Sequence, residues 1–203
     1  MNSAIRSITN NIKLDPYLAL STVIDWNHTS IKRLAIVLSD GCISQIEITK
    51  KCFEWVRDII KHSYDYKLNP VTCKASDVLQ YKTGYCFAKS HLLAALLRAN
   101  SIPAGLCYQR LRLERNKDAY CLHGLNAVYL PEQGWYRMDP RGNKPGINAQ
   151  FCPPLEMLAF ALENKLEYNM PEIYAEPIEV VVDALTTYDS WLEVYNNLPD
   201  VKL

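Results

Sequence analysis

Apolar residues recur every three to four positions in the first half of the chain. In segment 31–41, IKRLAIVLSDG, this period predicts a helix that Gly41 ends, and segment 46–62 repeats the pattern over a longer run. Segment 75–84 predicts a short helical turn that ends at its final glycine. The alanine- and leucine-rich run 86–99 predicts a further helix, so the first half of the chain is expected to be helical.

The pattern changes where this last helix is expected to end. Asn100 tolerates the left-handed conformation and is expected to cap the helix, and Pro103 prevents its continuation. Apolar and polar residues then alternate in segments 106–114, 120–130 and 134–139, which predicts strands with a PEQG turn between the last two. Helices followed by an antiparallel sheet indicate the α+β class.

Three later segments carry weaker signals. Segment 153–164 begins with a proline pair and is expected to be a helix, because proline favours the first helical turn. Segment 177–185, PIEVVVDAL, fits a strand or a short helix. Segment 189–198 is expected to be a final helix.

Composition and charge exclude several classes of protein. The 203 residues are 49% hydrophobic and 22% charged, which is typical of one folded domain with a sizeable core. Twenty-two Lys and Arg balance 22 Asp and Glu, so no overall positive field favours nucleic acid. The first 17 residues lack the continuous apolar run of a secretory signal, and no stretch approaches the roughly 18 apolar residues of a membrane span. We therefore expect neither nucleic acid nor a membrane as partner.

The cysteines indicate a reducing environment. Their number is odd and no two form a C-x-x-C pair, which argues against a disulfide framework and a zinc site and favours a cytoplasmic protein. Most of them are expected to fill the core. They are Cys42, Cys52, Cys73, Cys86, Cys107, Cys121 and Cys152.

Cys86 differs from the others because it stands at a predicted helix start. The unpaired N–H groups there carry roughly half a positive charge, which favours a thiolate over a thiol. A cysteine in this position is a candidate nucleophile, although a buried structural role is the alternative. A thiolate nucleophile needs a base within reach and a third group that orients the base.

Of the four histidines, His123 is the one placed to act as that base. His28 and His62 adjoin loop-like segments and are expected to be partly exposed. His91 follows Cys86 by five residues, about 500° around the helix, and so lies off the face of the cysteine.

A hairpin is expected to bring Asp139 to His123. The two residues are 16 positions apart and their midpoint is Pro131, which opens the PEQG turn. A hairpin folding there puts Asp139 opposite His123 or one same-face step away, at roughly 5 to 8 Å between Cβ atoms. A register shift of one residue would turn Asp139 to the other face of the sheet.

The stretches GYCFAKSHLLAALLRANSIPAG and HGLNAVYLPEQGWYRMDP resemble the core of the transglutaminase-like superfamily. The shared pattern is Gly-x-Cys at a helix start, Leu-Leu-Arg-Ala and Ile-Pro-Ala near its end, a His-led strand, a Gly-Trp hairpin and Asp-Pro. The resemblance covers about residues 45–142 and implies a papain-like α+β core with N-terminal helices on an antiparallel sheet. Residues 1–44 and 143–203 are then a helical N-terminal extension and a C-terminal extension of one domain, 1–203.

Carried over to this chain, the resemblance implies that Cys86 is the nucleophile, His123 the general base and acid, and Asp139 the residue that orients His123. Relatives include peptidases, amidases, protein cross-linkers and inactive scaffolds, so it leaves the reaction open. Phe87 stands where cross-linking members often have tryptophan, which weakens the case for Gln–Lys cross-linking. Asn100 stands where a glycine is common, and asparagine also tolerates that conformation.

Other roles have two interpretations each. The backbone N–H of Cys86 is the first candidate for binding the oxyanion. Gln80, at a spacing that resembles that of papain-type peptidases, either provides a second donor or is an exposed glutamine. Tyr85 either shapes the acyl pocket or belongs to the core. Arg141 either attracts an acidic substrate group or is a solvated loop residue, and segment 151–160 either covers the cleft or completes the core.

The expected function is a thiol enzyme that hydrolyses amide or ester bonds of a peptide, protein or small molecule through a thioester. It needs no cofactor and no metal, and the sequence has no calcium-binding loop of the D-x-D-x-D-G type. The alternatives are a protein-glutamine acyltransferase and a non-catalytic binding scaffold. A further alternative is a partner domain that binds through an exposed aromatic tail around Trp191 and Tyr195.

Overall fold

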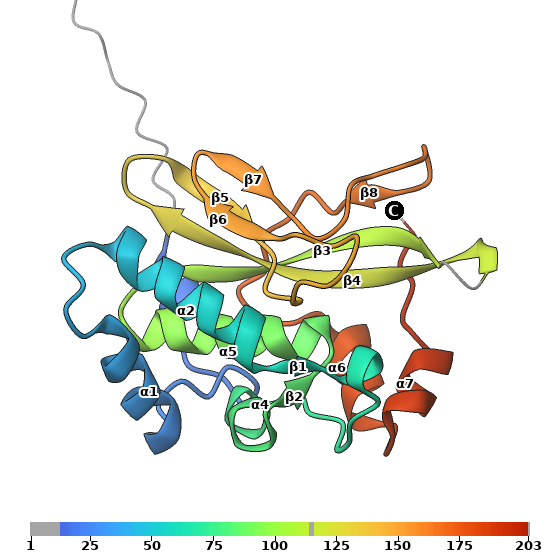
Figure 1. Ribbon diagram of the computed structural model, residues 1–203, viewed down its shortest axis with the longest axis horizontal. Coiled ribbons are helices and arrows are strands. Elements are labelled where there is room, and N and C mark those ends of the chain that lie inside the picture. The colour runs from blue at the N-terminus through green and yellow to red at the C-terminus, as the bar shows by residue number, and fades with distance from the viewer. Residues whose placement is uncertain (1–12, 114–115, 203) are drawn as a thin grey trace, which may run out of the picture.

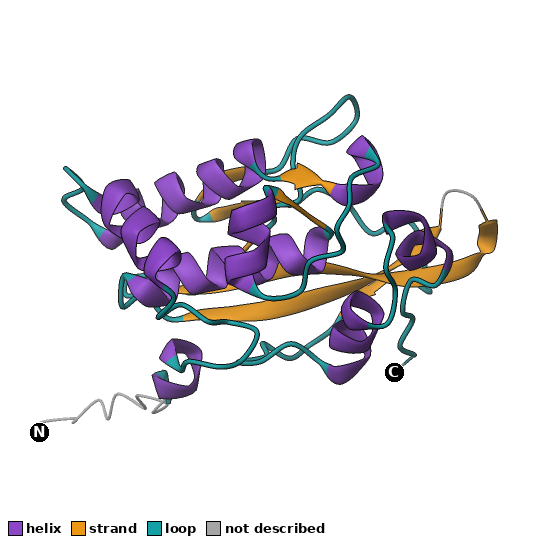
Figure 2. Cartoon of the chain, turned by 90° about the horizontal axis from the view of Figure 1, so that it is seen from below, coloured by secondary structure: helices purple, strands orange, loops and turns teal. Residues whose placement is uncertain are grey.

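Helices from the first half of the chain form a layer against one face of a curled antiparallel sheet (Figures 1 and 2). The computed structural model describes residues 13–113 and 116–202. Its helices are the 3-10 helix η1 (Asp15–Leu18), α1 (Thr29–Ser39), α2 (Gln45–Ile59), α3 (Ser63–Tyr66), α4 (Ala75–Tyr81), α5 (Cys86–Ala99), α6 (Glu179–Thr186) and α7 (Trp191–Asn196). Its strands are β1 (Lys61–His62), β2 (Thr83–Gly84), β3 (Ala104–Leu113), β4 (Asn116–Leu130), β5 (Gly134–Met138), β6 (Gln150–Cys152), β7 (Leu155–Met157) and β8 (Tyr168–Asn169). The predicted α+β class is confirmed.

Helix α5 lies at the centre of the helical layer. It packs against α1, α2 and α4 on one side and against β3 and β4 on the other. Every residue from Cys86 to Arg98 is buried. This explains why the run is apolar all round, since a helix covered on every side has no solvent face to leave polar.

The helices predicted for segments 31–41 and 46–62 are confirmed as α1 and α2. Gly41 follows α1 with a φ of +70°, the left-handed conformation that glycine adopts without strain. The turn predicted for 75–84 forms α4, which ends earlier than expected. Lys82 takes the left-handed cap position with a φ of 55°, and the final glycine of the segment pairs in β2 instead.

The predicted left-handed cap at Asn100 is wrong. Its φ is −94°, and Ser101, with a φ of 59°, occupies the left-handed position. The Asn100 amide instead donates hydrogen bonds to the carbonyls of Leu96 (3.0 Å) and Ala35 (3.4 Å). The side chain therefore ties the end of α5 to α1.

The main sheet has the strand order β5-β4-β3-β8, and all neighbouring strands are antiparallel. The three predicted strands are confirmed as β3, β4 and β5, although residue 114 of the first lies outside the described residues. On β4, Leu122 and Val128 point into the main core beneath the helices. Leu125 and Ala127, on the opposite face, form a smaller cluster with Cys107 of β3.

The helix predicted for 153–164 does not form, and that prediction is wrong. Strand β7 pairs there with β6 as a short hairpin. Its Glu156 carboxylate lies 2.7 Å from the Arg137 guanidinium of β5 and also accepts the Arg137 backbone N–H. The segment is therefore bound along the main sheet by contacts distant in sequence, which outweigh its local helix signals.

The last two predicted elements are both helices. Segment 177–185 forms α6 rather than a strand, and segment 189–198 contains α7 as expected. Tyr195 of α7 stacks on Tyr64 of α3 at 4.1 Å between ring centroids, and Trp191 lies 6.2 Å from the same ring. These aromatic residues are thus partly buried within the molecule and do not form the exposed tail considered above.

The residues after α7 return to the sheet. The backbone N–H of Leu122 on β4 donates to the Pro199 carbonyl at 2.7 Å. The Arg110 guanidinium of β3 pairs with both oxygens of Asp200 at 2.6 and 2.7 Å. The C-terminal segment is therefore fixed beside β4 by a backbone contact and an ion pair.

Among the helices of the described residues, none is long and apolar enough to cross a membrane. The expectation that no signal segment is present concerns the first 17 residues. Residues 1–12 of that stretch lie outside the described part of the chain.

Candidate active site

Cys86 is the first residue of α5, directly after the parallel β1–β2 pair. Its side chain lies at the start of the helix, where unpaired N–H groups favour negative charge. The backbone N–H of Gly124 on β4 donates to its sulfur at 3.4 Å. The residue is 7% exposed, so the sulfur sits in a sheltered position between the helix start and the sheet.

The β4–β5 register brings Asp139 to His123. Asn126 pairs with Met138, so Asp139 follows one same-face step from the position opposite His123, as the hairpin argument anticipated. His123 Nε2 and Asp139 Oδ2 are 2.7 Å apart. Both side chains are buried, which protects this hydrogen bond from competition with water.

Asp139 is held by the backbone as well as by His123. Its Oδ1 accepts the N–H of Arg141 at 3.0 Å, and its Oδ2 accepts the N–H of Ala159 at 3.1 Å. Burial raises the pKa of Asp139, but the positive charge of His123 and these hydrogen bonds outweigh it and lower the pKa below its usual value. Asp139 is therefore held as a carboxylate.

His123 has the opposite shift. Burial lowers its pKa, but the charges of Asp139 and Cys86 and the hydrogen bonds to both side chains raise it to about 10. The ring thus lies between a carboxylate and a sulfur, and this arrangement favours the imidazolium form. A thiolate and an imidazolium held together are the reactants of thiol-based acyl transfer.

The approach of β4 to α5 requires a glycine at position 124. A Cβ built there would lie 2.7 Å from the Phe87 ring and 3.0 Å from the Phe87 Cα. Only a residue without a side chain allows the strand this close to the helix start. The contact keeps the Gly124 N–H within reach of Cys86 and keeps His123, the preceding residue, beside it.

A cavity of about 410 Å³ opens at Cys86 and His123. Cys86, His123 and Tyr85 line it from the core, and Phe160 lines it from the segment after β7. Phe160 lies edge-on to the His123 ring at 4.9 Å between centroids. Of the two roles considered for segment 151–160, its position beside His123 favours the one of covering the cleft.

Gln80 is not brought to this site. It is exposed on α4 and is not among the residues that line the cavity around Cys86. This position agrees with the alternative of an exposed glutamine and gives no support to an oxyanion role. The backbone N–H at the start of α5 remains the candidate donor.

His62 corrects an expectation and is a site residue that the sequence did not reveal. Instead of being partly exposed it is 7% exposed and lines the cavity with Cys86. Its Nδ1 has no hydrogen-bond partner in the described structure and lies 3.7 Å from an Asp65 oxygen. Strand β1 is only two residues long, which is too short for an alternating apolar pattern to predict that His62 pairs opposite Gly84.

The other two histidines lie away from the reactive pair. His28 is exposed and accepts the N–H of Ser30 at the start of α1. His91 is buried, and its Nδ1 lies 2.8 Å from the Cys73 carbonyl. The fold therefore brings two histidines, His62 and His123, to the cavity that contains Cys86, and of these His123 is hydrogen-bonded to Asp139.

Two further residues with open roles also line the cavity. Tyr85 is 3% exposed and its hydroxyl donates to the Trp191 carbonyl at 2.5 Å, so it belongs both to the core and to the cavity wall. Arg141 is 6% exposed, which excludes a solvated loop position. Within the described residues, no three His, Cys, Asp or Glu side chains are grouped as a metal site requires.

Comparison with known proteins identifies the family. A model of the transglutaminase-like superfamily matches residues 32–140, more than half of the chain. Comparison with curated proteins gives no match. A candidate cysteine protease of known structure from Cytophaga hutchinsonii is 20% identical with a TM-score of 0.50, over 63% of this chain and 42% of that one.

The periplasmic domain of TgpA from Pseudomonas aeruginosa is 22% identical with a TM-score of 0.47, over 64% of this chain and 48% of that one. This chain thus spans less than half the length of either protein. The likeness to the Cytophaga hutchinsonii structure concerns the fold, whereas the superfamily model covers the helix of Cys86 and the hairpin of His123 and Asp139. By that match, the chain belongs to the transglutaminase-like superfamily.

Proposed function

We propose that this protein is a thiol hydrolase that cleaves amide or ester bonds through a thioester on Cys86. The observation that carries the proposal is the position of His123, which is hydrogen-bonded to Asp139 at 2.7 Å and lines the same cavity as Cys86. A nucleophile, a base and a group that orients the base are the parts that covalent acyl transfer needs.

The proposed reaction has two steps, acylation of Cys86 and hydrolysis of the thioester. The Cys86 thiolate attacks the carbonyl carbon, and the oxyanion forms where the N–H groups at the start of α5 can stabilise it. When the oxyanion collapses, His123 gives its proton to the departing amine or alcohol, which leaves a thioester. Water then attacks the thioester, His123 takes a proton from that water, and a carboxylic acid leaves as the thiolate is restored.

Asp139 acts on His123 rather than on the substrate. Its hydrogen bond to Nε2 leaves Nδ1 for Cys86 and keeps one ring orientation during proton transfer. The backbone N–H groups of Arg141 and Ala159 hold the carboxylate itself in place. We therefore assign Asp139 a positioning role.

The proposed substrate is a peptide, a protein or a small amide or ester, with no metal or cofactor. Water is the proposed acceptor because the described residues beside Cys86 form no evident amine-binding site. We further propose a reducing, cytoplasmic setting, supported by an odd number of cysteines, no two of which form a C-x-x-C pair. Acyl transfer to an amine and a non-catalytic scaffold are the rival functions that the experiment must separate.

The decisive experiment is site-resolved alkylation by iodoacetamide, measured by mass spectrometry across pH. Cys86 is expected to react well below pH 8, and His123→Ala is expected to abolish that early reaction, because the thiolate loses its imidazolium partner. Cys73 and Cys107 are internal controls, since burial raises their pKa to about 11 and about 12. Cys86 behaving like these two would contradict the enzyme and favour the scaffold.

A substrate measurement then separates the two reactions. Incubation of a panel of aryl esters and peptide amides with and without a primary amine distinguishes hydrolysis from transfer. Release of free acid at the same rate in both conditions supports hydrolysis. An amide product that replaces the acid would instead identify an acyltransferase.

A further inference from the structure

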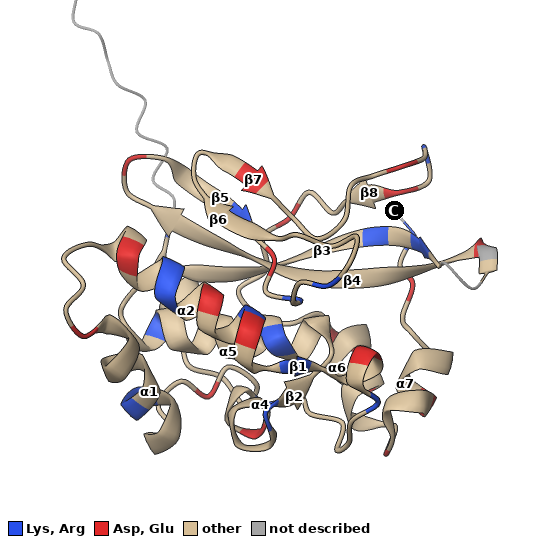
Figure 3. Ribbon diagram, viewed as in Figure 1, with Lys and Arg blue, Asp and Glu red and all other residues tan. Residues whose placement is uncertain are grey.

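A second cavity adjoins the one that contains Cys86. It has a volume of about 350 Å³ and lies between the end of α2, β1 and the loop after β5. The two cavities share three lining residues, His62, Arg141 and Lys144. Figure 3 shows Lys and Arg segments on the loop after β5, where it faces α2 and α5.

The wall of this second cavity has an excess of positive charge. Its lining includes five Lys and Arg residues against two carboxylates, Asp58 and Asp65. Asp58 is occupied by the neighbouring Arg57, with contacts of 2.7 and 2.9 Å. Asp65 is shared by two cations, Arg141 at 2.8 Å and Lys144 at 2.7 Å. The Asp65 carboxylate thus pairs with two cations, Arg141 and Lys144, and a bound anion would neutralise the remaining positive charge.

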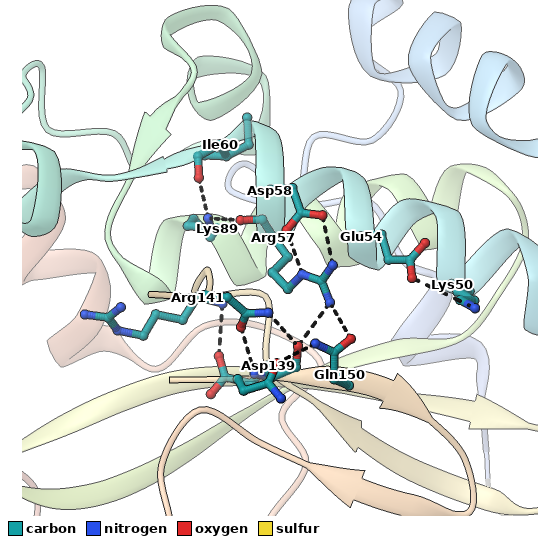
Figure 4. A network of polar contacts seen from close by, with 12 residues as sticks. Lys50, Glu54, Arg57, Asp58, Ile60, Lys89, Asp139, Arg141 and Gln150 are labelled. Atoms are coloured by element: carbon teal, nitrogen blue, oxygen red, sulfur yellow. Dashed lines mark hydrogen bonds and ion pairs between the residues drawn. The ribbon is translucent and has the colours of Figure 1, made fainter. Parts of the chain in front are cut away.

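Arg141 has unused capacity for such an anion. Its Nη2 donates to Asp65 Oδ1 at 3.2 Å. Its Nη1 lies 2.8 Å from Asp65 Oδ2 but not in a hydrogen-bonding geometry, and this atom is buried with no hydrogen-bond partner in the described structure. Figure 4 shows its side chain extending away from Arg57 and Lys89, which are engaged with Gln150 and with backbone carbonyls. A buried guanidinium N–H without a partner favours a planar, two-oxygen anion.

This group is close to the reactive pair. The Arg141 guanidinium lies 5.5 Å from the centre of the Phe160 ring, and that ring lies 4.9 Å from the ring of His123. On the other side, His62 lies 5.4 Å from the ring of Tyr85, the residue before Cys86. A substrate attacked by Cys86 can therefore extend to Arg141 within the joined cavities.

The acidic residues of the Cys86 cavity do not neutralise this end. The Glu167 carboxylate accepts three backbone N–H groups, from Arg112, Glu163 and Asn164. Glu163 itself lies 3.6 Å from the Arg112 guanidinium. Both acids are thus engaged beside Arg112, whereas the end shared with the second cavity is positive.

From this arrangement we propose that Arg141 and Lys144 form a subsite for a carboxylate, so that the enzyme prefers amides or esters with an acidic group near the scissile carbonyl. The substrate preference rests on the proposed hydrolase function, whereas binding of a carboxylate at Arg141 and Lys144 does not depend on it. Acidic peptide side chains and small dicarboxylic acid derivatives share this feature.

The test compares two reagents that alkylate Cys86 by displacing iodide. Iodoacetate carries the carboxylate, and iodoacetamide is its neutral match. Replacing Lys144 by Ala is expected to lower the ratio of the iodoacetate rate to the iodoacetamide rate about threefold, and Lys144→Glu about tenfold, as expected for one partly exposed charge. The imidazolium of His123 also attracts iodoacetate, but it is present in every variant and cancels in the comparison.

Lys32→Ala, which removes an exposed charge on α1 far from both cavities, is the matched control and is expected to leave the ratio unchanged. An unchanged ratio in Lys144→Glu would overturn the subsite. If Cys86 reacts with neither reagent, the proposed hydrolase function is rejected. The carboxylate subsite is then tested separately, by measuring the melting temperature with and without glutarate at constant ionic strength. A larger rise in melting temperature for the wild type than for Lys144→Glu supports it, and equal rises overturn it.

Discussion

At the scale of single residues, the electrostatics of His123 dominate the site. Its pKa of about 10 means that the ring keeps its proton across the neutral range, where an ordinary histidine has lost it. The shift is produced by neighbours, because burial alone acts in the opposite direction. The protein therefore depends on Asp139 and Cys86 to hold a charge that its interior disfavours.

Asp139→Asn is expected to remove most of the electrostatic stabilisation of the His123 imidazolium. An amide keeps the shape but not the charge, so burial should then lower the pKa of His123, and turnover should fall about 10²- to 10⁴-fold as general acid–base catalysis weakens. Titration of the His123 ring protons by NMR measures the first effect directly. Asp183→Asn, an exposed change on α6, is the control. An unchanged His123 titration would contradict the assigned role of Asp139.

The same pair links stability to pH. The folded pKa of His123 is above its unfolded value near 6.5, so its contribution to the free energy of unfolding is fully present below that pH and is lost toward pH 10. Asp139, with its lowered folded pKa, contributes above its unfolded value of 3.8 and loses this contribution as the pH falls further. In Asp139→Asn, the decline in stability on the alkaline side should therefore be smaller in a denaturant series across pH.

At the scale of elements, the contact between β4 and α5 positions Cys86 and His123. Gly124→Ala is expected to push the strand away from Phe87 and to destabilise the protein by about 1 to 3 kcal/mol, as overpacking does. Alkylation of Cys86 should slow in the same variant, since His123 moves with the strand.

Gly134→Ala provides the comparison for this prediction. That glycine has a φ of +74° and no neighbouring atom within 4 Å of an added Cβ, so only backbone strain of roughly 1 to 3 kcal/mol is expected. Chemical denaturation measures both variants, and the alkylation rate of Cys86 distinguishes them. Slowed alkylation in both variants alike would show that stability loss, not the displaced strand, is responsible.

The sequence predicted elements well where the signal was local. The β4–β5 hairpin follows from alternating apolar residues and a polar turn, and that register already brought Asp139 to His123. Segment 153–164 could not be predicted this way. Its proline and leucine pattern is typical of a helix, whereas the contacts of Glu156 with Arg137 and of Ala159 with Asp139 come from residues distant in sequence.

The same limit applies to individual site residues. Cys86 was indicated by its place at a helix start, which is a local feature. The burial of His62 depends on a two-residue parallel pairing with Gly84, and the position of Phe160 beside His123 depends on the course of a loop. Neither arrangement leaves a periodic pattern in the chain.

At the scale of the whole molecule, Arg98 joins three distant segments. It is 2% exposed at the end of α5, and its guanidinium donates to the carbonyls of Ala19, Ala104 and Ala175. The Leu-Leu-Arg-Ala and Ile-Pro-Ala pattern thus has a physical reason: the arginine of the first part binds the carbonyl of the alanine in the second. The N–H groups of the Arg98 guanidinium thus hold the N-terminal segment, the start of β3 and the chain before α6 together.

Arg98→Met is expected to cost about 2 to 4 kcal/mol, because the carbonyls of Ala19, Ala104 and Ala175 lose their donor and that of Ala104 is buried. Arg98→Lys should lie between the wild type and Arg98→Met, since an ammonium cannot reach all three. Equilibrium urea unfolding measures the loss, and Arg33→Met, an exposed change on α1, is the control. Equal unfolding midpoints for Arg98→Met and the wild type would refute the role of Arg98.

The C-terminal segment has a consequence beyond its own contacts. Strand β5 pairs with β4 only from Asn126 to Leu130, so the preceding part of β4 has no neighbour from β5 on that side. The Pro199 carbonyl accepts the Leu122 N–H there, and the Arg110–Asp200 pair anchors the segment. Without it, an open strand edge would be available to another copy of the chain, and such edges template aggregation. By occupying the Leu122 N–H, the segment removes a backbone donor through which a strand of another copy could pair with this sheet.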